Sequence, residues 1–391
     1  MSSLLTPWRS VAAAFVLNGV LFGTWASRVP AVVMRFDLSE ADLGALLLLL
    51  GLGALISFPL AGRLSDRFGA VRVTRSIAVA LLTSIIFLGF APTLPLLGAA
   101  LFLFGMCHGS MDVTMNSWAS EVEKHMGRPV MSSFHAMWSL GAGLGAASGY
   151  FGAHANAPLH LHFLVTAVFV GCLLGPILCL DWQSAIRKKQ KVAGSLPLPR
   201  GALFLVGLIA LASGLGEGVA ADWSAVYLHD VVGTAEAHAA LGYAGFSAAM
   251  VVMRLAADFL VTRFGSTVVA RFSGVSAALG TFLIVAPSET LPVVLVGFVL
   301  MGVGYAALIP LTFSRAAADP HVPPGQAIAS IATFAYGAMV LGPPAIGLLA
   351  EATSLRVCFG VVGISAVLVA ALAPVLEEQH AVGAIARGES R

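Results

Sequence analysis

The sequence predicts an all-α membrane protein, with twelve transmembrane helices arranged in two six-helix halves. Hydrophobic residues make up 58% of the chain and charged residues 10%, whereas a soluble domain has about 25% charged residues. Apolar runs recur along the whole chain with lengths that suit a bilayer, since one crossing takes about 20 residues. Basic residues gather in every second gap between these runs, as they do in membrane proteins of fixed orientation. A soluble fold is therefore excluded, and the net charge of +2 gives no reason to expect a nucleic-acid partner.

Twelve apolar runs, taken in chain order, are the expected helices. They cover 10–34, 43–62, 73–91, 94–119, 130–154, 160–181, 201–228, 239–262, 267–286, 291–314, 325–350 and 355–376. Several are rich in glycine and alanine, which let membrane helices pack closely because lipid gives no hydrophobic drive for association. Pro343 and Pro344 should bend the eleventh helix, whose neighbours must then satisfy the carbonyl groups that lose their donors.

The basic residues predict the orientation of the chain. With a cytoplasmic N-terminus, the cytoplasmic side carries most of the basic residues that lie between helices: Arg63, Arg67, Arg72, Arg75, Lys124, Arg128, Arg187, Lys188, Lys189, Lys191, Arg200, Arg263, Arg271, Arg315, Arg387 and Arg391. The opposite side carries only Arg28, Arg35 and Arg356. This asymmetry predicts a multi-pass protein of the bacterial inner (cytoplasmic) membrane with both termini in the cytoplasm.

Enzymatic and metal chemistry find no support in the residue pattern. The four cysteines lie inside apolar runs and are expected to be small core residues: Cys107, Cys172, Cys179 and Cys358. No spacing of Cys and His resembles a metal site, and no phosphate-binding Gly-x-x-x-x-Gly-Lys loop is present. No nucleophile–base pair stands out either. We therefore expect no metal, no cofactor and no enzymatic activity.

The two halves of the chain look like copies of each other. Trp25-Ala26-Ser27 in the first helix matches Trp223-Ser224-Ala225 in the seventh, and Arg67-Phe68-Gly69 matches Arg263-Phe264-Gly265. The repeat includes the first apolar run, which favours a retained helix over a cleaved signal peptide. It divides the chain into a first half at 1–182, a cytoplasmic linker at 183–199 and a second half at 200–391 with a short cytoplasmic tail.

A basic segment between the second and third helices carries a family resemblance. In Gly62-Arg63-Leu64-Ser65-Asp66-Arg67-Phe68-Gly69, the pattern Gly-x-Leu-x-Asp-Arg-x-Gly resembles the signature loop of the major facilitator superfamily of transporters. Ala70 and Val71 stand where that family has a basic pair. Parallel six-helix halves are also typical of the superfamily. The resemblance implies a gating role for Gly62, Asp66, Arg67 and Gly69.

Further motifs resemble a bacterial branch of the superfamily that includes MosC-like membrane proteins. They are Trp25-Ala-Ser-Arg-Val-Pro30, Asp112-x-x-x-Asn116, Phe134-His135 and Ala221-Asp-Trp-Ser-Ala-Val-Tyr227. This branch is linked by name to rhizopine, an inositol-derived amine. The superfamily resemblance also implies a central cavity lined mainly by helices one, four, seven and ten.

Ionisable residues inside apolar runs are the candidate coupling groups, because each is costly in hydrocarbon. On the fourth helix, His108, Asp112 and Asn116 follow at i, i+4 and i+8 and share one face. They predict either a solute or proton site or a hydrogen-bonded clamp between helices. Asp112 and His135 are expected at similar depth, where a His–Asp pair can exchange a proton near neutral pH.

The second half adds Glu217 on the seventh helix, where burial would favour the protonated carboxyl and suit a proton carrier. Asp222 is expected to pair with Arg28 at the outer rim. Arg254 and Asp258 stand at i, i+4 on the eighth helix, and we expect an ion pair that latches the cytoplasmic gate.

The candidate residues fall into three groups. The expected solute-binding group is Asn18, Trp25, Arg28, His108, Asn116, Trp138, Trp223, Tyr227, Tyr305 and Tyr336, whose aromatic members offer stacking surfaces for a ring-shaped solute or act as packing residues. The expected proton-coupling group is Asp112, His135 and Glu217. The expected gating group is Gly62, Asp66, Arg67, Gly69, Arg254 and Asp258.

These observations predict a monomeric secondary active transporter that moves a small polar solute, such as a sugar, an inositol or an amine derivative. Alternating access coupled to proton symport is the favoured mechanism. A proton-coupled antiporter that exports a drug or metabolite is the alternative. The Gly-Pro-x-x-Gly element of proton antiporters belongs in the fifth helix, where Gly141 to Gly149 has no proline, which weakens that alternative. A non-transporting membrane sensor is a third reading.

Overall fold

The computed structural model describes residues 2–127, 130–184, 200–286, 290–322 and 324–377. The described residues form helices and connecting turns, without strands. The helices of the first half are α1 Ser2–Ser27, α2 Val29–Phe36, α3 Glu40–Phe68, α4 Ala70–Phe90, α5 Leu94–Met126, α6 Met131–His154 and α7 Leu159–Leu178. Those of the second half are α8 Ala202–Val226, η1 Tyr227–Val231, α9 Glu236–Ala239, α10 Leu241–Phe264, α11 Ser266–Val285, α12 Leu291–Tyr305, α13 Leu308–Ala317, α14 Pro324–Ala352, α15 Leu355–Leu372 and η2 Ala373–Leu376.

Each of the twelve predicted runs is helical. Among the described residues, eleven helical segments are long and apolar enough to cross a membrane. The remaining run, 130–154, corresponds to α6, which has 24 residues but also carries histidine, serine and many glycines that lower its hydropathy. α6 nevertheless packs within the bundle, against α1 and α10. The all-α membrane fold expected from the sequence is therefore confirmed.

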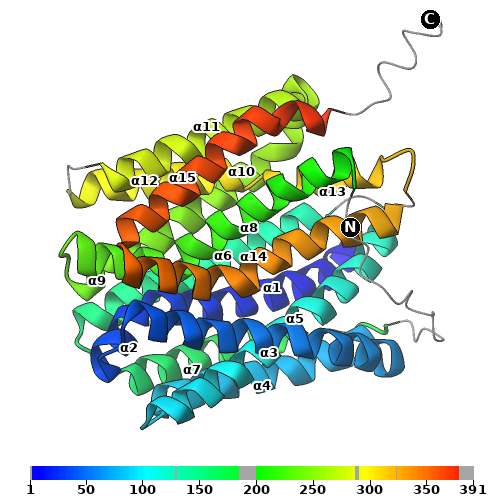
Figure 1. Cartoon of the computed structure of the whole chain (residues 1–391). Helices are drawn as coiled ribbons and strands as arrows, with labels where there is room; N and C mark the ends of the chain where they lie inside the picture. Colours follow the sequence, from blue (N-terminus) through cyan, green and yellow to red (C-terminus); the bar gives the residue numbers. More distant parts are fainter. Residues whose placement is uncertain (1, 128–129, 185–199, 287–289, 323, 378–391) are drawn as a thin grey trace, which may run out of the picture.

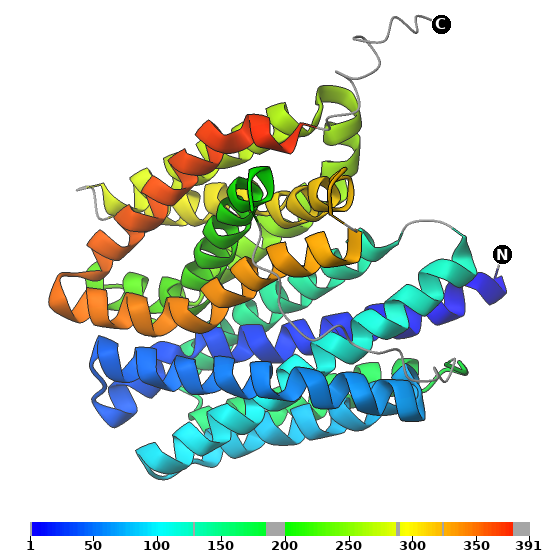
Figure 2. The same ribbon diagram turned by 45° about the vertical axis from the view of Figure 1, so that its right-hand side comes forward.

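The helices form two groups that follow the two halves of the sequence. In Figures 1 and 2, the blue to cyan helices lie in the lower part of the bundle and the yellow to red helices in the upper part. The halves meet mainly where α6 packs against α10 and where α3 packs against α14. α2 and α9 lie at one end of the bundle, and the N-terminus lies at the opposite end (Figure 1). We call these the Arg28 end and the Gly69 end.

Small residues allow the closest contacts inside the first half. α1 and α6 share one of the most extensive helix pairings in the molecule. A Cβ atom on Gly23 would overlap the carbonyl group of Ala142, and one on Gly145 would overlap that of Val20. The glycine-rich composition of the fifth predicted helix thus has a packing role, as expected for helices that associate in lipid.

The segment with the family signature is the end of a helix, which corrects its prediction as a loop. Arg63 to Phe68 belong to α3, and the turn to α4 is made by Gly69 alone, with φ 88° and ψ 140°. Gly265 joins α10 to α11 in the same way, with φ 82° and ψ 157°. Both values lie in a region that only glycine adopts readily. The repeat seen in the sequence therefore extends to backbone geometry.

Gly62 does not mark a close contact between helices. Among the described residues, no atom of another segment lies within 4 Å of the position that its Cβ would occupy. A close approach of a second helix, which a glycine there could have allowed, is therefore not seen, and this leaves the expected gating role untested. Its pattern neighbours Asp66 and Arg67 are exposed, and the Arg67 guanidinium lies 5.0 Å from the centre of the Phe68 ring.

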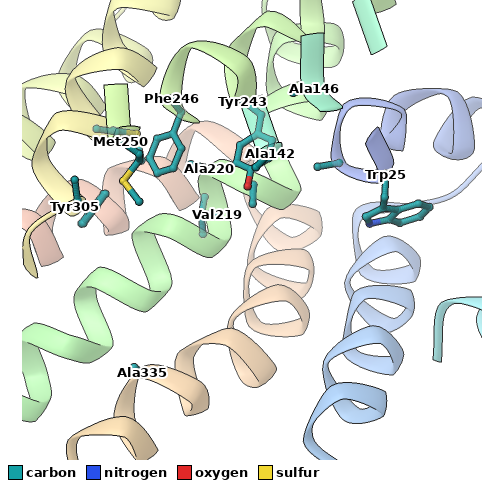
Figure 3. Packing of buried hydrophobic residues seen from close by; sticks show 14 of the residues in the cluster. Trp25, Ala142, Ala146, Val219, Ala220, Tyr243, Phe246, Met250, Tyr305 and Ala335 are labelled. Carbon is teal, nitrogen blue, oxygen red and sulfur yellow. The ribbon is translucent and has the colours of Figure 1, made fainter. Parts of the chain in front are cut away.

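Large aromatic side chains fill the core between helices. Figure 3 shows Trp25, Tyr243, Phe246 and Tyr305 among small side chains such as Ala142 and Ala220. The rings of Trp25 and Tyr305 are fully buried. A Cβ on Gly216 would overlap the Tyr305 ring, so this glycine makes room for it.

Candidate functional site between the two halves

A charged network joins the halves at mid-depth. Arg254 of α10 places Nη2 3.2 Å from Oε2 of Glu217 on α8. Its Nη1 donates to Oγ of Ser139 on α6 at 2.6 Å, and also to the carbonyl oxygen of His135 at 3.4 Å. Ser213 donates to Oε1 of Glu217 at 3.2 Å. A single guanidinium in the second half thus binds α6 of the first half.

This network corrects the predicted pairing of Arg254. Asp258, four residues later on the same helix, is exposed, and the ion pair of Arg254 is made with Glu217. The side chains of Arg254 and Glu217 are 13% and 24% exposed, so the pair is largely withdrawn from solvent. A buried charge without a partner is strongly destabilising, which explains why Arg254 binds the carboxylate that shares its depth.

The polar stripe on α5 lies along one face of the helix, as predicted. Nδ2 of Asn116 donates to the backbone carbonyl oxygen of Asp112 at 2.8 Å and to its Oδ1 at 3.1 Å. The His108 ring stacks on Phe22 with ring centres 5.0 Å apart, and its Nδ1 is a buried atom without a hydrogen-bond partner. All three stripe residues are partly buried, and the missing partner of His108 Nδ1 refers to the residues that the structure describes.

The expected His135–Asp112 pair is replaced by other contacts. The His135 ring packs edge-on against Phe15 of α1, with ring centres 5.4 Å apart. The side-chain hydrogen bond of Asp112 is made with Asn116 on its own helix. In the structure, Arg254 therefore contacts the backbone of His135, and Asp112 contacts Asn116 of the stripe.

An aromatic cluster made of Phe22, His108, Trp138 and Tyr243 crosses between the halves. Phe22 of α1 lies 5.9 Å from the Trp138 ring of α6 and 6.3 Å from the Tyr243 ring of α10, measured between ring centres. Sequence reasoning missed Phe22 and Tyr243. Phe22 stands between Asn18 and Trp25 at helical spacing, and this spacing was the available signal.

The structure places several expected solute-binding residues in packed surroundings. Trp25, Trp223, Tyr227 and Tyr305 are fully buried. The Tyr227 hydroxyl donates to the carbonyl oxygen of Ile284 at 2.7 Å. Buried Asn18 approaches Sδ of Met115 at 3.8 Å through its Nδ2. These contacts fit the packing alternative for the aromatic residues.

Two of the expected aromatic residues have partly accessible side chains. Trp138 is partly buried and belongs to the aromatic cluster. Tyr336 is 38% exposed and packs its ring against Phe58 of α3, with ring centres 5.4 Å apart. Since α3 and α14 belong to different halves, Tyr336 lies at the second seam between them.

A second charged group joins the halves at the Arg28 end. Nε of Arg28, at the break between α1 and α2, lies 2.6 Å from Oε1 of Glu236 in α9. Nη1 of Arg28 lies 3.3 Å from Nδ1 of His162 in α7, and Nε2 of His162 lies 3.1 Å from Oγ of Ser148 in α6. We call these four residues the Arg28 latch.

The latch corrects the predicted pairing of Arg28 with Asp222, since the carboxylate that binds Arg28 is Glu236. Burial lowers the pKa of the Arg28 guanidinium, and the Glu236 carboxylate opposes that change. Glu236 and His162 were missed in the sequence. His162 lies in a run with His154 and His160, and nothing in that pattern singles it out.

A cavity of about 290 Å³ opens beside the latch. It is lined by Arg28, Ala31, Arg35, Pro158, Leu159 and His160. Within the described ranges, no group of three or more His, Cys, Asp and Glu side chains is arranged to hold a metal ion. The chemistry available at both sites is therefore ion pairing, hydrogen bonding and proton exchange.

Comparisons with known proteins agree with this architecture. The family model described as Major Facilitator Superfamily matches residues 11–320 and again residues 206–387. A protein of Sinorhizobium fredii described as uncharacterized transporter y4wD is 70% identical over 97% of this chain and 100% of its own length. The membrane protein MosC of Rhizobium meliloti is 29% identical over 96% of this chain and 91% of its own.

A relative from Yersinia pestis, described as an uncharacterized MFS-type transporter, is 34% identical over 93% of this chain and 94% of its own. Among solved structures, the nucleoside transporter NupG resembles the chain in fold. A variant of NupG superposes with a TM-score of 0.76 at 13% identity, covering 95% of this chain and 99% of its own. At that identity the likeness concerns the fold alone.

Proposed function

The chain belongs to the major facilitator superfamily and is a membrane transporter, and from that premise we propose that it carries a small polar solute in symport with protons. The observation that carries this proposal is the network of Arg254 with Glu217 and Ser139. It joins the two halves at mid-depth, where transporters with internal repeats bind their substrates.

Rocking of the halves requires the Arg254 contacts to change. In the present arrangement Arg254 binds Ser139 of one half and Glu217 of the other. A polar solute that hydrogen-bonds to Arg254 would compete with Ser139 and loosen α10 from α6, and a proton on Glu217 would weaken the ion pair that orients Arg254 toward α6. The binding free energy of solute and proton would thus be linked to the opening of the halves.

The proposed solute is small, polar and ring-shaped, such as a sugar, an inositol or an amine derivative. The partly buried candidates include Trp138 for stacking and Asn116 and His108 for hydrogen bonds, and the Nδ1 atom of His108 has no partner among the described residues. The relatives add modest support, because the name MosC belongs to the branch expected from the sequence motifs. NupG is named for nucleosides, so nucleosides belong in the test panel.

Proton coupling is assigned to Asp112 first and Glu217 second. Asp112 shares its face with His108 and Asn116, and its described side-chain hydrogen bond comes from a neutral amide. Glu217 is already paired with Arg254, so a proton on Glu217 would have to disrupt that ion pair. We propose further that the transporter acts as a monomer in the bacterial inner membrane, with both termini cytoplasmic.

The deciding experiment is transport by the purified protein in liposomes. A thermal-shift screen against sugars, inositols, amines and nucleosides selects the ligand, and uptake is then followed under an imposed pH gradient. Accumulation driven by protons that flow into the liposomes supports symport. Accumulation driven by protons that flow out of the liposomes identifies an antiporter. Ligand binding without any flux would identify a sensor and overturn the proposal.

A further inference from the structure

The Arg28 latch fixes the protonation state of a histidine. An arginine side chain has only hydrogen-bond donors, so Nδ1 of His162, 3.3 Å from Nη1 of Arg28, must be the acceptor. The proton of the neutral ring then lies on Nε2, which donates to Oγ of Ser148 at 3.1 Å. Ser148 in turn donates to the carbonyl oxygen of Gly145 at 2.6 Å. In this series of hydrogen bonds, every donor has an acceptor only while His162 is neutral.

The latch is built into the fold. Arg28 is 3% exposed and His162 is 7% exposed. Nη2 of Arg28 also donates to the carbonyl oxygen of Ala157 at 2.9 Å. A Cβ on Gly152 would lie 3.0 Å from Nη1 of Arg28 and 3.1 Å from Cγ of His162, so α6 has a glycine where these side chains meet. The fold thus orients both groups toward each other and leaves little of either side chain exposed.

We propose that His162 is a proton-binding site whose protonation releases the Arg28 latch and opens the transporter at the Arg28 end. A proton on Nδ1 would turn an acceptor into a donor that faces the donor Nη1. It would also set two positive charges side by side in a site of low polarity, where their repulsion is strong. The ion pair of Arg28 with Glu236 crosses between the halves, so displacement of Arg28 would separate them.

The charged and titratable groups around His162 are few among the described residues. The break between α1 and α2 presents Arg28, and α9 presents Glu236, which reaches His162 only through Arg28. α6 presents Ser148, which does not titrate in the physiological range. On α7 itself, His160 stands two residues earlier, is exposed, and packs its ring against Phe90 of α4. Histidine is the side chain that ordinarily changes charge between pH 5 and pH 8, and His162 is the buried histidine of this set.

The direction of the effect follows from linkage. His162 binds a proton more tightly when Arg28 has moved away, so acid favours the open form and alkali the closed form. This inference uses the rocking motion of the family and does not depend on the solute or on Asp112. A negative result would not count against the proposed coupling of solute to protons at mid-depth, because the experiment below needs no substrate.

The test measures the distance between spin labels at Asn156 and Ala235. Both positions are exposed at the Arg28 end, and they lie in different halves. The four native cysteines are replaced first, and the labelled protein is placed in lipid nanodiscs at pH 8 and pH 5. The measurement gives the population with a short distance, which is closed at this end, and the population with a long distance, which is open. We expect acid to lower the ratio of the closed to the open population by about fivefold or more, which is the lower end of ordinary coupling between sites.

Two variants and one matched control complete the test. His162→Gln keeps an acceptor and a donor but cannot be protonated, so the pH effect should vanish with the closed form retained. Glu236→Gln weakens the ion pair, so it should raise the open population at pH 8 while the pH effect persists. His160→Gln should behave like the parent protein. A pH effect of full size in His162→Gln, or its loss in Glu236→Gln alone, would overturn the proposal.

Discussion

Arg254 of α10 contacts both halves of the molecule: its Nη2 lies 3.2 Å from Oε2 of Glu217, and its Nη1 donates to Ser139 of α6 at 2.6 Å. The pair with Glu217 holds α8 to α10 inside one half, while the bond to Ser139 holds that half to the other. The stability of the present state therefore depends in part on one guanidinium, whose contact with α6 the proposed rocking motion would break.

The first prediction concerns the free energy of unfolding. Arg254→Gln leaves the Glu217 carboxylate without its cation and should destabilise the protein by about 3 kcal/mol, as for other buried pairs that lose one partner. The double variant with Glu217→Gln should lose less than the sum of the single changes. Equilibrium denaturation in mixed micelles measures these values. Arg263→Gln, an exposed change on the same helix, is the control and should stay within about 1 kcal/mol of the parent. Additive losses in the double variant would show that the two side chains are not coupled.

The second prediction compares two glycines of the signature segment. Gly69 has φ 88° and ψ 140°, so Gly69→Ala should destabilise the protein by about 1–3 kcal/mol. Gly62 is helical, and no atom of another described segment lies within 4 Å of its missing Cβ, so Gly62→Ala should be neutral or stabilise by about 0.5–1 kcal/mol. Thermal unfolding of the purified variants checks both values. Equal losses for the two substitutions would contradict the assigned backbone roles.

The helices, the repeat and the signature turn could be predicted because they depend on local patterns. Apolar run length gives the helices, and Gly69 and Gly265 mark the turns that repeat between halves. Partner choice could not be predicted in the same way. Arg254 has Asp258 at i+4 but binds Glu217, and Arg28 binds Glu236 rather than Asp222. Which carboxylate reaches a buried cation depends on helix packing, and no spacing within one helix reveals that.

The third prediction concerns the exposed carboxylate of the signature segment. Asp66 lies near the Gly69 end of α3, and no ion pair of Asp66 is present among the described residues. Because Asp66 lies far from the Arg254 network, Asp66→Asn should leave solute affinity nearly unchanged. The gating role that the family resemblance implies predicts slower exchange between conformations in this variant. Affinity is read from ligand titration and exchange from counterflow rates. A large loss of affinity with normal counterflow would refute the gating role.

The fourth prediction concerns topology. The basic residues predict that the linker at 183–199 and both termini are cytoplasmic, although most of this linker and the C-terminal tail lie outside the described residues. Reporter proteins fused at Lys189 and at Arg391 should report a cytoplasmic location. A fusion at Asn156, at the Arg28 end, is the matched control and should report the opposite side. Periplasmic signals at Lys189 and Arg391 would invert the orientation.

The last prediction concerns Asp112 and the coupling of solute to protons. Asp112 accepts a hydrogen bond from Nδ2 of Asn116 at 3.1 Å, and an asparagine at this position keeps an oxygen that can accept it. Asp112→Asn therefore resembles the protonated carboxyl in charge and shape but cannot release a proton. We expect such a carrier still to exchange solute, because counterflow uses only the form that is loaded with solute and protonated.

We accordingly expect Asp112→Asn to abolish accumulation of solute under a pH gradient and to leave counterflow at equal pH largely intact. Glu217→Gln is measured beside it and should impair counterflow as well, because it also removes the carboxylate that binds Arg254. Undiminished accumulation in both variants would show that neither carboxylate carries the coupling proton. Loss of counterflow in Asp112→Asn, with the protein still folded, would instead make Asp112 a binding or packing residue, since a proton carrier is needed for accumulation and not for exchange.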